Sequence, residues 1–114
     1  MGEKAGSSSK AKTLSPQDLI ILSETFRLLG DPSRLKILLH CSEGSKSVSE
    51  IAEELELSQS LVSHHLRLLR GARLVRGTRR SKNVFYEIAD DHVSDMLRDM
   101  ISHIGEENSQ GSFA

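Results

Sequence analysis

Two histidines and two acidic residues near the end of the chain have the types and spacing of metal ligands. Asp90, His92, His103 and Glu106 all lie in the stretch DDHVSDMLRDMISHIGE. Eleven residues advance an α-helix by about 1100°, so His92 and His103 face the same side but lie roughly 16 Å apart along the axis. Zinc–nitrogen bonds measure about 2.0–2.1 Å. One ion therefore cannot bind both histidines of a single straight helix.

A second copy of the helix removes this difficulty. An apolar stripe at three- to four-residue spacing runs beside both histidines and can pack on itself in an isologous dimer. Two antiparallel copies bring Asp90 and His92 of one chain to His103 and Glu106 of the other, a ligand set that zinc accepts in tetrahedral geometry. The alternative is a solvated acidic face on which two histidines occur by chance. The stripe consists of Val93, Met96, Leu97, Met100, Ile101 and Ile104.

The spacing within each half of this set also matters. His103 and Glu106 are three residues apart and share a helix face. Asp90 and His92 are two residues apart, so within a helix their side chains diverge. They converge only if Asp90 lies at the helix cap or before it. The Asp90-Asp91 step can supply that cap.

Composition places the chain among small folded proteins. Its 114 residues suit one domain, and a hydrophobic content of 37% supports a modest core that a partner chain would help to complete. The single Cys41 has no partner for an internal disulfide, which favours a reducing compartment. No apolar run approaches the roughly 20 residues of a membrane helix, and the first residues do not resemble a signal peptide. We expect a cytoplasmic protein.

Charge is unevenly distributed along the chain. The formal net charge of −1 argues on its own against a nucleic-acid partner. Residues 57–86, however, contain seven Lys and Arg and no acidic residue, whereas the remainder contains eight basic and all sixteen acidic residues. Such a segment can bind phosphates locally in a near-neutral protein. A solvated basic face is the alternative interpretation.

Capping signals mark the first two helices. In SPQDLIILSETFRLLG, Ser15 is a good N-cap, Pro16 suits the first helical position and Gly30 can end the helix. Asp31 and Pro32 repeat this device before PSRLKILLHC. The expected buried stripe of the second helix is Leu35, Leu38 and Leu39.

Two short helices follow with a tight turn between them. SVSEIAEEL opens with a capping box in which Ser47 and Glu50 bond each other's backbone. Ser58 then begins SQSLVSHHLRLLRGARL, which Gly71 is expected to stop. Two short helices joined by a turn of three or four residues are the helix-turn-helix arrangement. The expected buried side of the second helix is Leu61, Val62, Leu66, Leu68 and Leu69.

The remaining pattern predicts a hairpin and a final helix. Residues 74–76 and 84–88 are β-rich runs that flank the polar turn GTRRSKN. The fold class is therefore mainly α with a small β-hairpin (α+β), a winged helix-turn-helix that dimerises through its terminal helices. We expect a disordered tail over 1–14, the domain over 15–106 and a flexible tail over 107–114.

The second helix of the pair is expected to read DNA. The major groove, about 12 Å wide, admits a helix whose N-terminal side chains meet base edges. Gln59 can pair with adenine, whereas Arg67 and Arg70 suit phosphates. His64 can touch a base or a phosphate, or be exposed by accident, and His65 is expected to pack. The predicted DNA-binding set is Gln59, Ser60, Ser63, His64, Arg67 and Arg70 on the helix and Arg79, Arg80 and Lys82 on the wing.

These stretches together resemble the ArsR/SmtB family of metal-responsive winged-helix repressors over roughly residues 15–106. The resemblance rests on LGDPSRLKILL, SVSEIAEELELSQSLVSHHLRLLRGARLV and the terminal helix. It implies a homodimer whose metal binding releases operator DNA, with His103 bonded to a backbone carbonyl near Arg73. The zinc/cobalt branch carries Asp-x-His, ten residues, His, two residues, then His or Glu. That pattern is matched by Asp90, His92, His103 and Glu106.

Departures from other branches narrow the expected ligand. Family members that sense arsenic, cadmium or lead use clustered cysteines, but Ser47 stands at the usual first cysteine position and Glu50 follows it. Cys41 is alone, and thiophilic ions require several thiolates. Cys41 is therefore expected to be a packed residue. Gly105 lies between the last two ligands and is expected to loosen the helix there, which makes Glu106 the least certain ligand.

We therefore predict a repressor rather than an enzyme. It binds operator DNA as a metal-free homodimer, and zinc, or cobalt or nickel, releases it by filling two sites per dimer, so that efflux or storage genes are expressed. A winged-helix regulator of a non-metal effector is the main alternative. A zinc hydrolase needs an open coordination position and a positioned base, for which no additional residues are visible. A module that binds another protein through the terminal helix is a further alternative.

Overall fold

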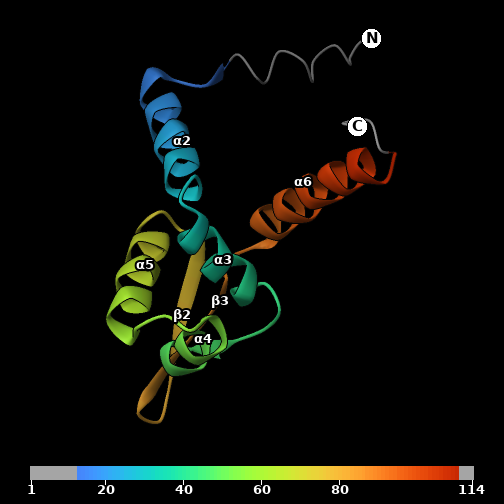
Figure 1. Ribbon diagram of the computed structural model, residues 1–114. Helices are drawn as coiled ribbons and strands as arrows, with labels where there is room; N and C mark the ends of the chain where they lie inside the picture. The colour runs from blue at the N-terminus through green and yellow to red at the C-terminus, as the bar shows by residue number, and fades with distance from the viewer. Residues whose placement is uncertain (1–12, 111–114) are drawn as a thin grey trace.

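Figure 1 shows the arrangement of the chain in a computed structural model, which describes residues 13–110, with side chains to residue 106. Three helices and a small sheet form the body of the molecule. Helices α2 and α6 extend from the body on the side away from the hairpin tip (Figure 1). The elements are α2 (Pro16–Leu29), α3 (Pro32–Cys41), β1 (Lys46–Ser47), α4 (Val48–Leu55), α5 (Gln59–Gly71), β2 (Val75–Arg80), β3 (Asn83–Ile88) and α6 (Asp91–Gln110).

The predicted caps of the first two helices are confirmed. The side chain of Ser15 accepts a hydrogen bond of 3.0 Å from the backbone N–H of Asp18, and Pro16 occupies the first turn of α2. Asp31 accepts one of 2.9 Å from the backbone N–H of Arg34 at the start of α3. Each carboxylate or hydroxyl supplies a partner for an N–H that the helix itself leaves unpaired.

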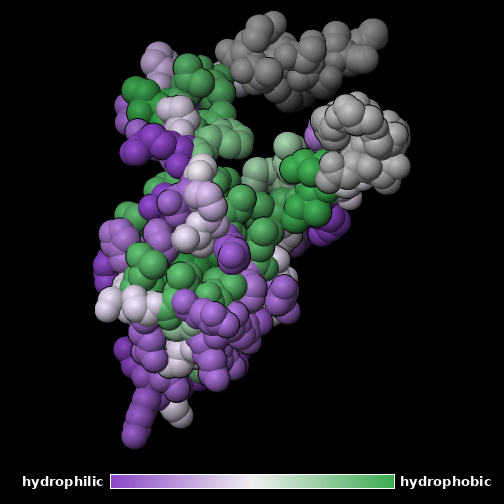
Figure 2. All heavy atoms as spheres, in the orientation of Figure 1, coloured by the Kyte–Doolittle hydropathy of each residue, from purple (hydrophilic) through white to green (hydrophobic). Residues whose placement is uncertain are grey.

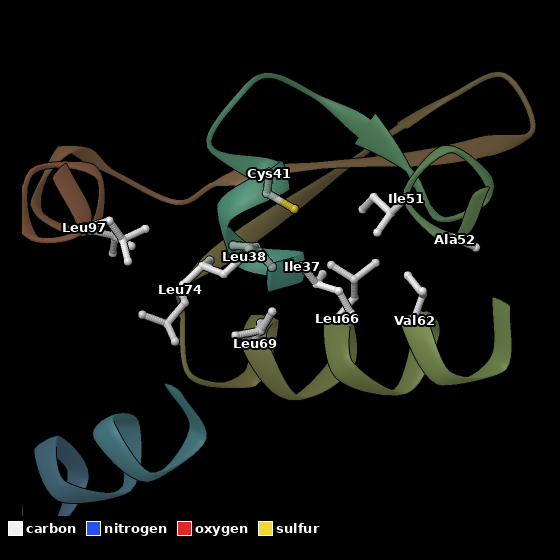
Figure 3. Close-up of a cluster of buried hydrophobic side chains, with 12 residues drawn as sticks. Ile37, Leu38, Cys41, Ile51, Ala52, Val62, Leu66, Leu69, Leu74 and Leu97 are labelled. Atoms are coloured by element: carbon white, nitrogen blue, oxygen red, sulfur yellow. The ribbon is translucent and has the colours of Figure 1, made fainter. Parts of the chain in front are cut away.

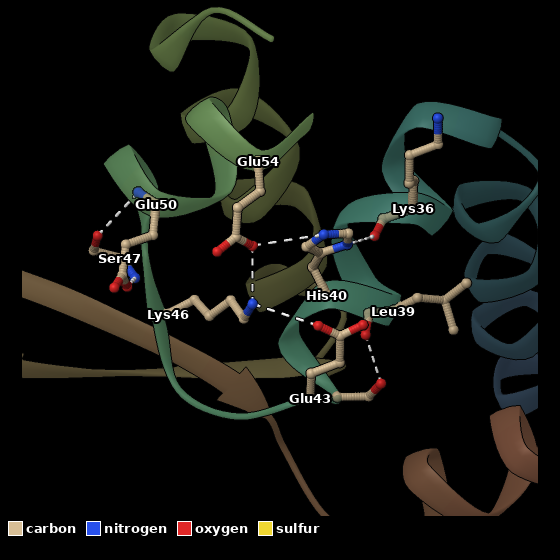
Figure 4. Close-up of polar contacts among 9 residues, drawn as sticks. Lys36, Leu39, His40, Glu43, Lys46, Ser47, Glu50 and Glu54 are labelled. Carbon is tan, nitrogen blue, oxygen red and sulfur yellow. Dashed lines mark hydrogen bonds and ion pairs between the residues drawn. The ribbon is translucent and has the colours of Figure 1, made fainter. Parts of the chain in front are cut away.

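The helix-turn-helix pair begins with the predicted capping box. Ser47 Oγ accepts from the backbone N–H of Glu50, and Glu50 Oε1 accepts from the backbone N–H of Ser47 at 2.8 Å (Figure 4). Helix α4 ends at Leu55 and is followed by its C-cap Glu56, which adopts the left-handed conformation with φ 57° and ψ 46°. This residue reverses the chain direction so that Ser58 can cap α5, where it accepts a hydrogen bond from the backbone N–H of Leu61.

A cluster of charged side chains connects α3, β1 and α4 on the outside of the core. Lys46 Nζ donates to Glu54 Oε1 at 2.9 Å and to Glu43 Oε1 at 3.4 Å, and His40 Nε2 lies 3.6 Å from the same Glu54 oxygen (Figure 4). The hydrogen bond with Glu54 is the main cause that raises the pKa of Lys46 and lowers that of Glu54. Glu54 is exposed and Lys46 is half-buried, so solvent screens the pair and it contributes little to the stability of the fold.

The sheet has three antiparallel strands in the order β1-β3-β2. The hairpin strands are longer than predicted, because pairing continues from Val75 opposite Ile88 to Arg80 opposite Asn83. The turn is therefore only Ser81 and Lys82, with Ser81 at φ 56°. Strand β1, which pairs Lys46 with Tyr86 and Ser47 with Phe85, was not predicted.

The core lies between α3, α4 and α5, with contributions from the sheet and α6 (Figure 3). Ile37 and Leu38 of α3 have no exposed surface, whereas the predicted Leu35 and Leu39 are only half-buried. Helix α5 directs Val62, Leu66 and Leu69, all 0% exposed, into this core. Burial of such side chains contributes roughly 1.5–3 kcal/mol each. The outer face of α5 is thereby held toward solvent.

Helix α6 continues beyond the predicted domain end. It runs without a break through Gly105 to Gln110, so the expected loosening at Gly105 is not seen and residues 107–110 are helical. Of the two predicted tails, residues 1–12 and 111–114 lie outside the described part of the chain. Within the described part, no helix is both long enough and apolar enough to cross a membrane.

Candidate DNA-reading surface and metal ligands

Helix α5 presents most of the predicted DNA-binding residues together. Gln59, Ser60, His64, Arg67 and Arg70 are exposed along one side of α5, opposite the side chains that enter the core. Because its first residues are capped by Ser58 and its inner face is packed, this helix has a fixed, polar outer face. That geometry allows insertion into a major groove.

Three residues of α5 differ from the predicted division into faces, one of them being Leu68, which was expected to be buried but is only half-buried. Leu61 was expected to be buried but is 38% exposed, because it lies beside Ser58 at the open N-terminal end of the helix rather than over the core. Ser63 was expected to face out but is half-buried. An apolar side chain on the reading face is suited to contact a thymine methyl group.

The hairpin carries its basic residues toward solvent. Arg79, Arg80 and Lys82 are all exposed at the end of the wing. The Arg80 guanidinium lies over the ring of Phe85, 5.0 Å from its centroid, in a cation–π contact. Near the base of the wing Arg76 pairs with Glu87 at 3.0 Å across the strands. The charge at the tip therefore stays available, whereas that of Arg76 is partly neutralised.

A polar hollow connects the reading helix to the wing. Gln59 and Ser63 line it from α5, and Lys82 lines it from the turn. Four further polar residues that were not predicted as DNA contacts also line it, namely Ser47, Ser49, Asn83 and Tyr86, together with Val48 and Val84. Nothing in the sequence indicated that these residues belong to the surface. Those at the start of α4 come beside the wing only because β1, which directly precedes α4, pairs with β3. The predicted helix and wing residues thus form one continuous surface.

The predicted metal ligands occupy α6 and its cap. Asp90 is the N-cap, because its Oδ1 accepts a hydrogen bond of 3.1 Å from the backbone N–H of Val93. The same oxygen lies 3.7 Å from Nδ1 of His92, whose side chain is 97% exposed. Two ligands of a tetrahedral zinc ion with bonds of about 2.0–2.1 Å are roughly 3.3 Å apart. Asp90 and His92 are therefore spaced much as one half of a zinc site requires.

The second half of the set lies further along the same helix. His103 and Glu106 are exposed on α6, and residue 106 is within the continuous helix. Among the described residues of one chain, no three His, Cys, Asp or Glu side chains gather closely enough to hold a metal. Within this described part of the chain, no hydrogen bond joins His103 to a backbone carbonyl near Arg73. The four predicted ligands are thus not brought together within one chain.

Cys41 is a core residue, as predicted. It is 1% exposed, and burial raises the pKa of its thiol to about 12 in spite of the opposing charge of Lys46. A thiol with this pKa is not ionised at neutral pH and is a poor metal ligand.

An exposed apolar face covers the two helices that extend from the body. Helix α2 has no buried residue, and Phe26 is 56% exposed. Figure 2 shows hydrophobic side chains over α2 and along α6. A groove between α2, α3 and α6 is lined by Phe26, Leu29, Met96, Met100 and Ile104 among others. Contiguous apolar surface of this kind marks an interface. The sequence analysis found the part on α6 but missed α2, where Leu19, Ile20, Ile21 and Leu22 are also exposed around the helix.

This architecture defines the class of protein. Three helices with a capped second and third member, followed by a two-stranded wing, are a winged helix-turn-helix, and solved DNA-binding domains share the fold. A homodimeric winged helix-turn-helix DNA-binding domain of a possible ArsR-family regulator from Mycobacterium bovis matches with a TM-score of 0.72 at 23% identity, covering 96% of this chain and 94% of that one.

Sequence comparison then identifies the family. Residues 31–76 match the family described as bacterial regulatory protein, arsR family. The transcriptional regulator NmtR of Mycobacterium tuberculosis is 36% identical over 98 residues, which cover 86% of this chain and 82% of NmtR. The solution structure of apo-NmtR matches with a TM-score of 0.70, covering 82% and 78% of the two chains. The chain belongs to the arsR family of bacterial regulatory proteins, in agreement with the expectation of a regulator rather than an enzyme.

A second relative is matched over only part of its length. The transcriptional repressor SmtB homologue of Synechocystis sp. is 39% identical over 85 residues, which make up 75% of this chain. The same residues span 64% of that repressor, somewhat less than two thirds of its length.

Proposed function

We propose that this protein is a metal-responsive transcriptional repressor, which binds operator DNA as a homodimer and releases it when zinc binds between the two α6 helices. The observation that carries the proposal is the pairing of Asp90 with His92 at one end of α6 while His103 and Glu106 lie at the other. Each end offers half of a four-ligand set. Cobalt and nickel accept similar ligands, so they are alternative effectors for the same site.

DNA binding is supported by the exposed face of α5 and by the wing. Phosphate contacts from Arg67, Arg70 and the wing residues would supply most of the affinity, and Gln59, Ser60 and His64 would meet base edges. A dimer doubles this surface, and two recognition helices about 34 Å apart would enter successive major grooves on one side of the duplex. The operator is then expected to be a pseudo-palindrome.

Dimerisation is supported by the apolar face on α2 and α6. A second copy is the occupant that the residues favour, because the same face on both chains is self-complementary in a two-fold dimer. An antiparallel pair of α6 helices places the Asp90 end of one beside the His103 end of the other. The two sites are then equivalent by symmetry.

Repression and metal binding are linked thermodynamically. If zinc weakens DNA binding by a given factor, DNA weakens zinc binding by the same factor. Arg73 lies just beyond α5, with φ 62°. The family resemblance implies that a backbone carbonyl near Arg73 would accept a hydrogen bond from the ring N–H of His103 that does not face the ion. That contact would connect the metal end of α6 to the end of the reading helix.

The experiment that tests the proposal uses mixed dimers. His92→Ala and His103→Ala are purified separately, each is expected to lose zinc binding, and the two are mixed and allowed to exchange chains. In the mixed dimer one site lacks both histidines and the other is intact. Zinc binding, measured by calorimetry, and zinc-dependent release of DNA, measured by fluorescence anisotropy with fragments selected by the protein in vitro, should both be partly restored.

A matched control distinguishes a metal site shared between two chains from a nonspecific effect of mixing two variants. When Asp90→Ala is mixed with His92→Ala, every site lacks a ligand from the same end of α6, so nothing should be restored. If the first mixture is as inactive as its parents, the site does not bridge two chains. If the wild-type protein binds DNA but ignores zinc, a regulator with a non-metal effector is the correct function.

A further inference from the structure

His65 is a buried polar residue on the reading helix that the proposed function does not use. It is 6% exposed, and among the described residues it is the one polar or charged side chain in the buried class. It lies on the inner side of α5, next to the exposed His64, with the two rings 5.7 Å apart. A buried imidazole requires a hydrogen-bond partner.

Arg34 of α3 is that partner. Its Nε–H donates to Nδ1 of His65 at 3.2 Å, so Nδ1 is the acceptor and the ring proton is on Nε2. Nε2 in turn lies 3.9 Å from Oδ2 of Asp31, the cap of α3. The ring is therefore held between a cation and a carboxylate from the same helix.

The same guanidinium also binds the end of α2. Its second nitrogen donates to the carbonyl of Leu28 at 2.9 Å. That carbonyl would bond the N–H four residues later in a continuous helix, but the residue there is Pro32, which has none. Arg34 thus supplies the partner that Pro32 cannot. The side chain of Arg34 therefore connects α2, which is part of the proposed dimer interface, to α5, which carries the proposed DNA-binding face.

We propose that His65 is a positioning residue for DNA binding, whose neutral ring, through Arg34, fixes α5 relative to α2, and whose protonation weakens DNA binding without zinc. The inference rests on the proposed function for its DNA readout. It concerns the interior of one chain and not the ends of α6.

The chemistry of the pair gives the direction of the effect. A protonated His65 has an N–H at Nδ1, so the Arg34 hydrogen bond is lost and two positive groups face each other at 3.2 Å. Asp31 opposes this repulsion only in part, and His64 adds to it. Burial, followed by the charge of Arg34, lowers the pKa of His65 from its usual 6.5. The ring is accordingly neutral at neutral pH.

The sign of the pH dependence follows from that lowering. The unfolded chain binds a proton at its usual pKa, whereas the folded chain resists it. The stability contributed by the neutral ring is therefore complete above about pH 6.5 and is lost as the pH falls below this value toward the lowered pKa of His65 in the folded chain. The neighbouring His64 lies on the exposed face that is proposed to meet DNA, so it must be removed for the effect of His65 to be seen alone. The test is therefore made in a His64→Gln background.

Two substitutions of His65 separate positioning from packing. His65→Asn keeps an acceptor oxygen near the place of Nδ1 but does not titrate. His65→Leu keeps apolar volume and removes the acceptor. DNA affinity is measured by anisotropy between pH 5.5 and 7.5 with a chelator present, and circular dichroism checks that each variant is folded.

In the His64→Gln background, affinity should fall about tenfold on acidification, equivalent to about 1.4 kcal/mol. His65→Asn should remove this dependence and retain zinc-induced release at pH 7.5, whereas His65→Leu should bind weakly at every pH. An equal pH dependence in His65→Asn overturns the inference.

A readout without DNA keeps the inference separate from the proposed function. In the full chain, NMR of the imidazole nitrogens should show the proton of His65 on Nε2 at pH 7.5. On acidification, the amide signals of Leu28 and of α5 should shift with the midpoint of His65, and His65→Asn should abolish that shift. A proton on Nδ1, or the same shifts in His65→Asn, contradicts the inference even if the protein proves not to bind zinc.

Discussion

The carboxylate of Asp90 lies 3.7 Å from the imidazole of His92, although the two residues are two apart and would diverge inside a helix. They converge because Asp90 is the N-cap, held by the backbone N–H of Val93 and outside the helical turn that carries His92. The cap thus stabilises the helix end and aims the carboxylate. One local feature of the backbone produces half of the proposed zinc site.

The apolar face predicts a dimer that a single charge can disrupt. Ile104→Glu places a carboxylate in the proposed interface, and a buried unpaired charge is costly. We expect sedimentation to show mostly monomer at concentrations where the wild type is dimeric. Arg98→Glu, on a different face of α6, should remain dimeric. A dimer that tolerates Ile104→Glu would mean that the chains meet elsewhere.

Arg67 on the outer face of α5 is predicted to contact a phosphate. Arg67→Ala should weaken DNA binding and reduce the slope of log affinity against log salt by about 0.9, the value for one phosphate contact. Anisotropy titrations over a range of salt concentrations measure the slope. Arg98→Ala, on α6, should leave it unchanged. An unaltered slope in Arg67→Ala would remove this residue from the phosphate contacts.

Gly77 is predicted to be required by the packing of the wing. A Cβ atom at this position would lie 3.0 Å from atoms of both Tyr86 and Val84 on the facing strand. Gly77→Val should therefore destabilise the fold by about 1–3 kcal/mol, as measured by urea unfolding. Gly71→Ala, where no atom lies within 4 Å, should be neutral or stabilising. Equal effects of the two substitutions would contradict this role.

The left-handed residue between α4 and α5 is predicted to store strain. Glu56 has φ 57°, a conformation that costs an ordinary L-residue roughly 1–2 kcal/mol. Glu56→Gly should raise the free energy of unfolding by about 0.5–1 kcal/mol. Glu53→Gly, inside α4, should lower it by about 1 kcal/mol. Thermal or chemical unfolding that ranks these two variants in the reverse order would show that the turn is not strained.

The buried thiol is predicted to be inert in the folded protein. With the pKa of Cys41 at about 12, a thiol reagent at pH 8 should label it only as fast as the chain unfolds. Because the folded pKa is above the unfolded one, this group stabilises the fold fully below about pH 9 and progressively less as the pH rises toward 12. Rapid labelling without denaturant would contradict the burial of Cys41.

Features set by neighbouring residues were predicted well from the sequence. Ser15, Asp31 and Ser47 each cap a helix as expected, because a cap depends on residues within one turn. The basic residues of α5 and the wing were also assigned correctly to an exposed surface. Membership of the family followed from contiguous stretches of the same elements.

Features that depend on distant residues were missed. Strand β1 exists only because Lys46 lies opposite Tyr86, forty residues later. The bond from Arg34 to His65 spans 31 residues and cannot be read from either neighbourhood. Helix α2 carries apolar residues around much of its surface, so periodicity gave no single inner face and its role in an interface was not recognised.

The separation of charge along the chain has a consequence for how the protein meets its target. Residues 57–86 contain seven basic residues and no acidic one, whereas all sixteen acidic residues lie elsewhere, so each protomer is an electric dipole with its positive end at α5 and the wing. The field of a duplex turns such a molecule before contact and repels its opposite end. Productive encounters are thereby favoured over random collisions, and rate as well as affinity becomes sensitive to ionic strength.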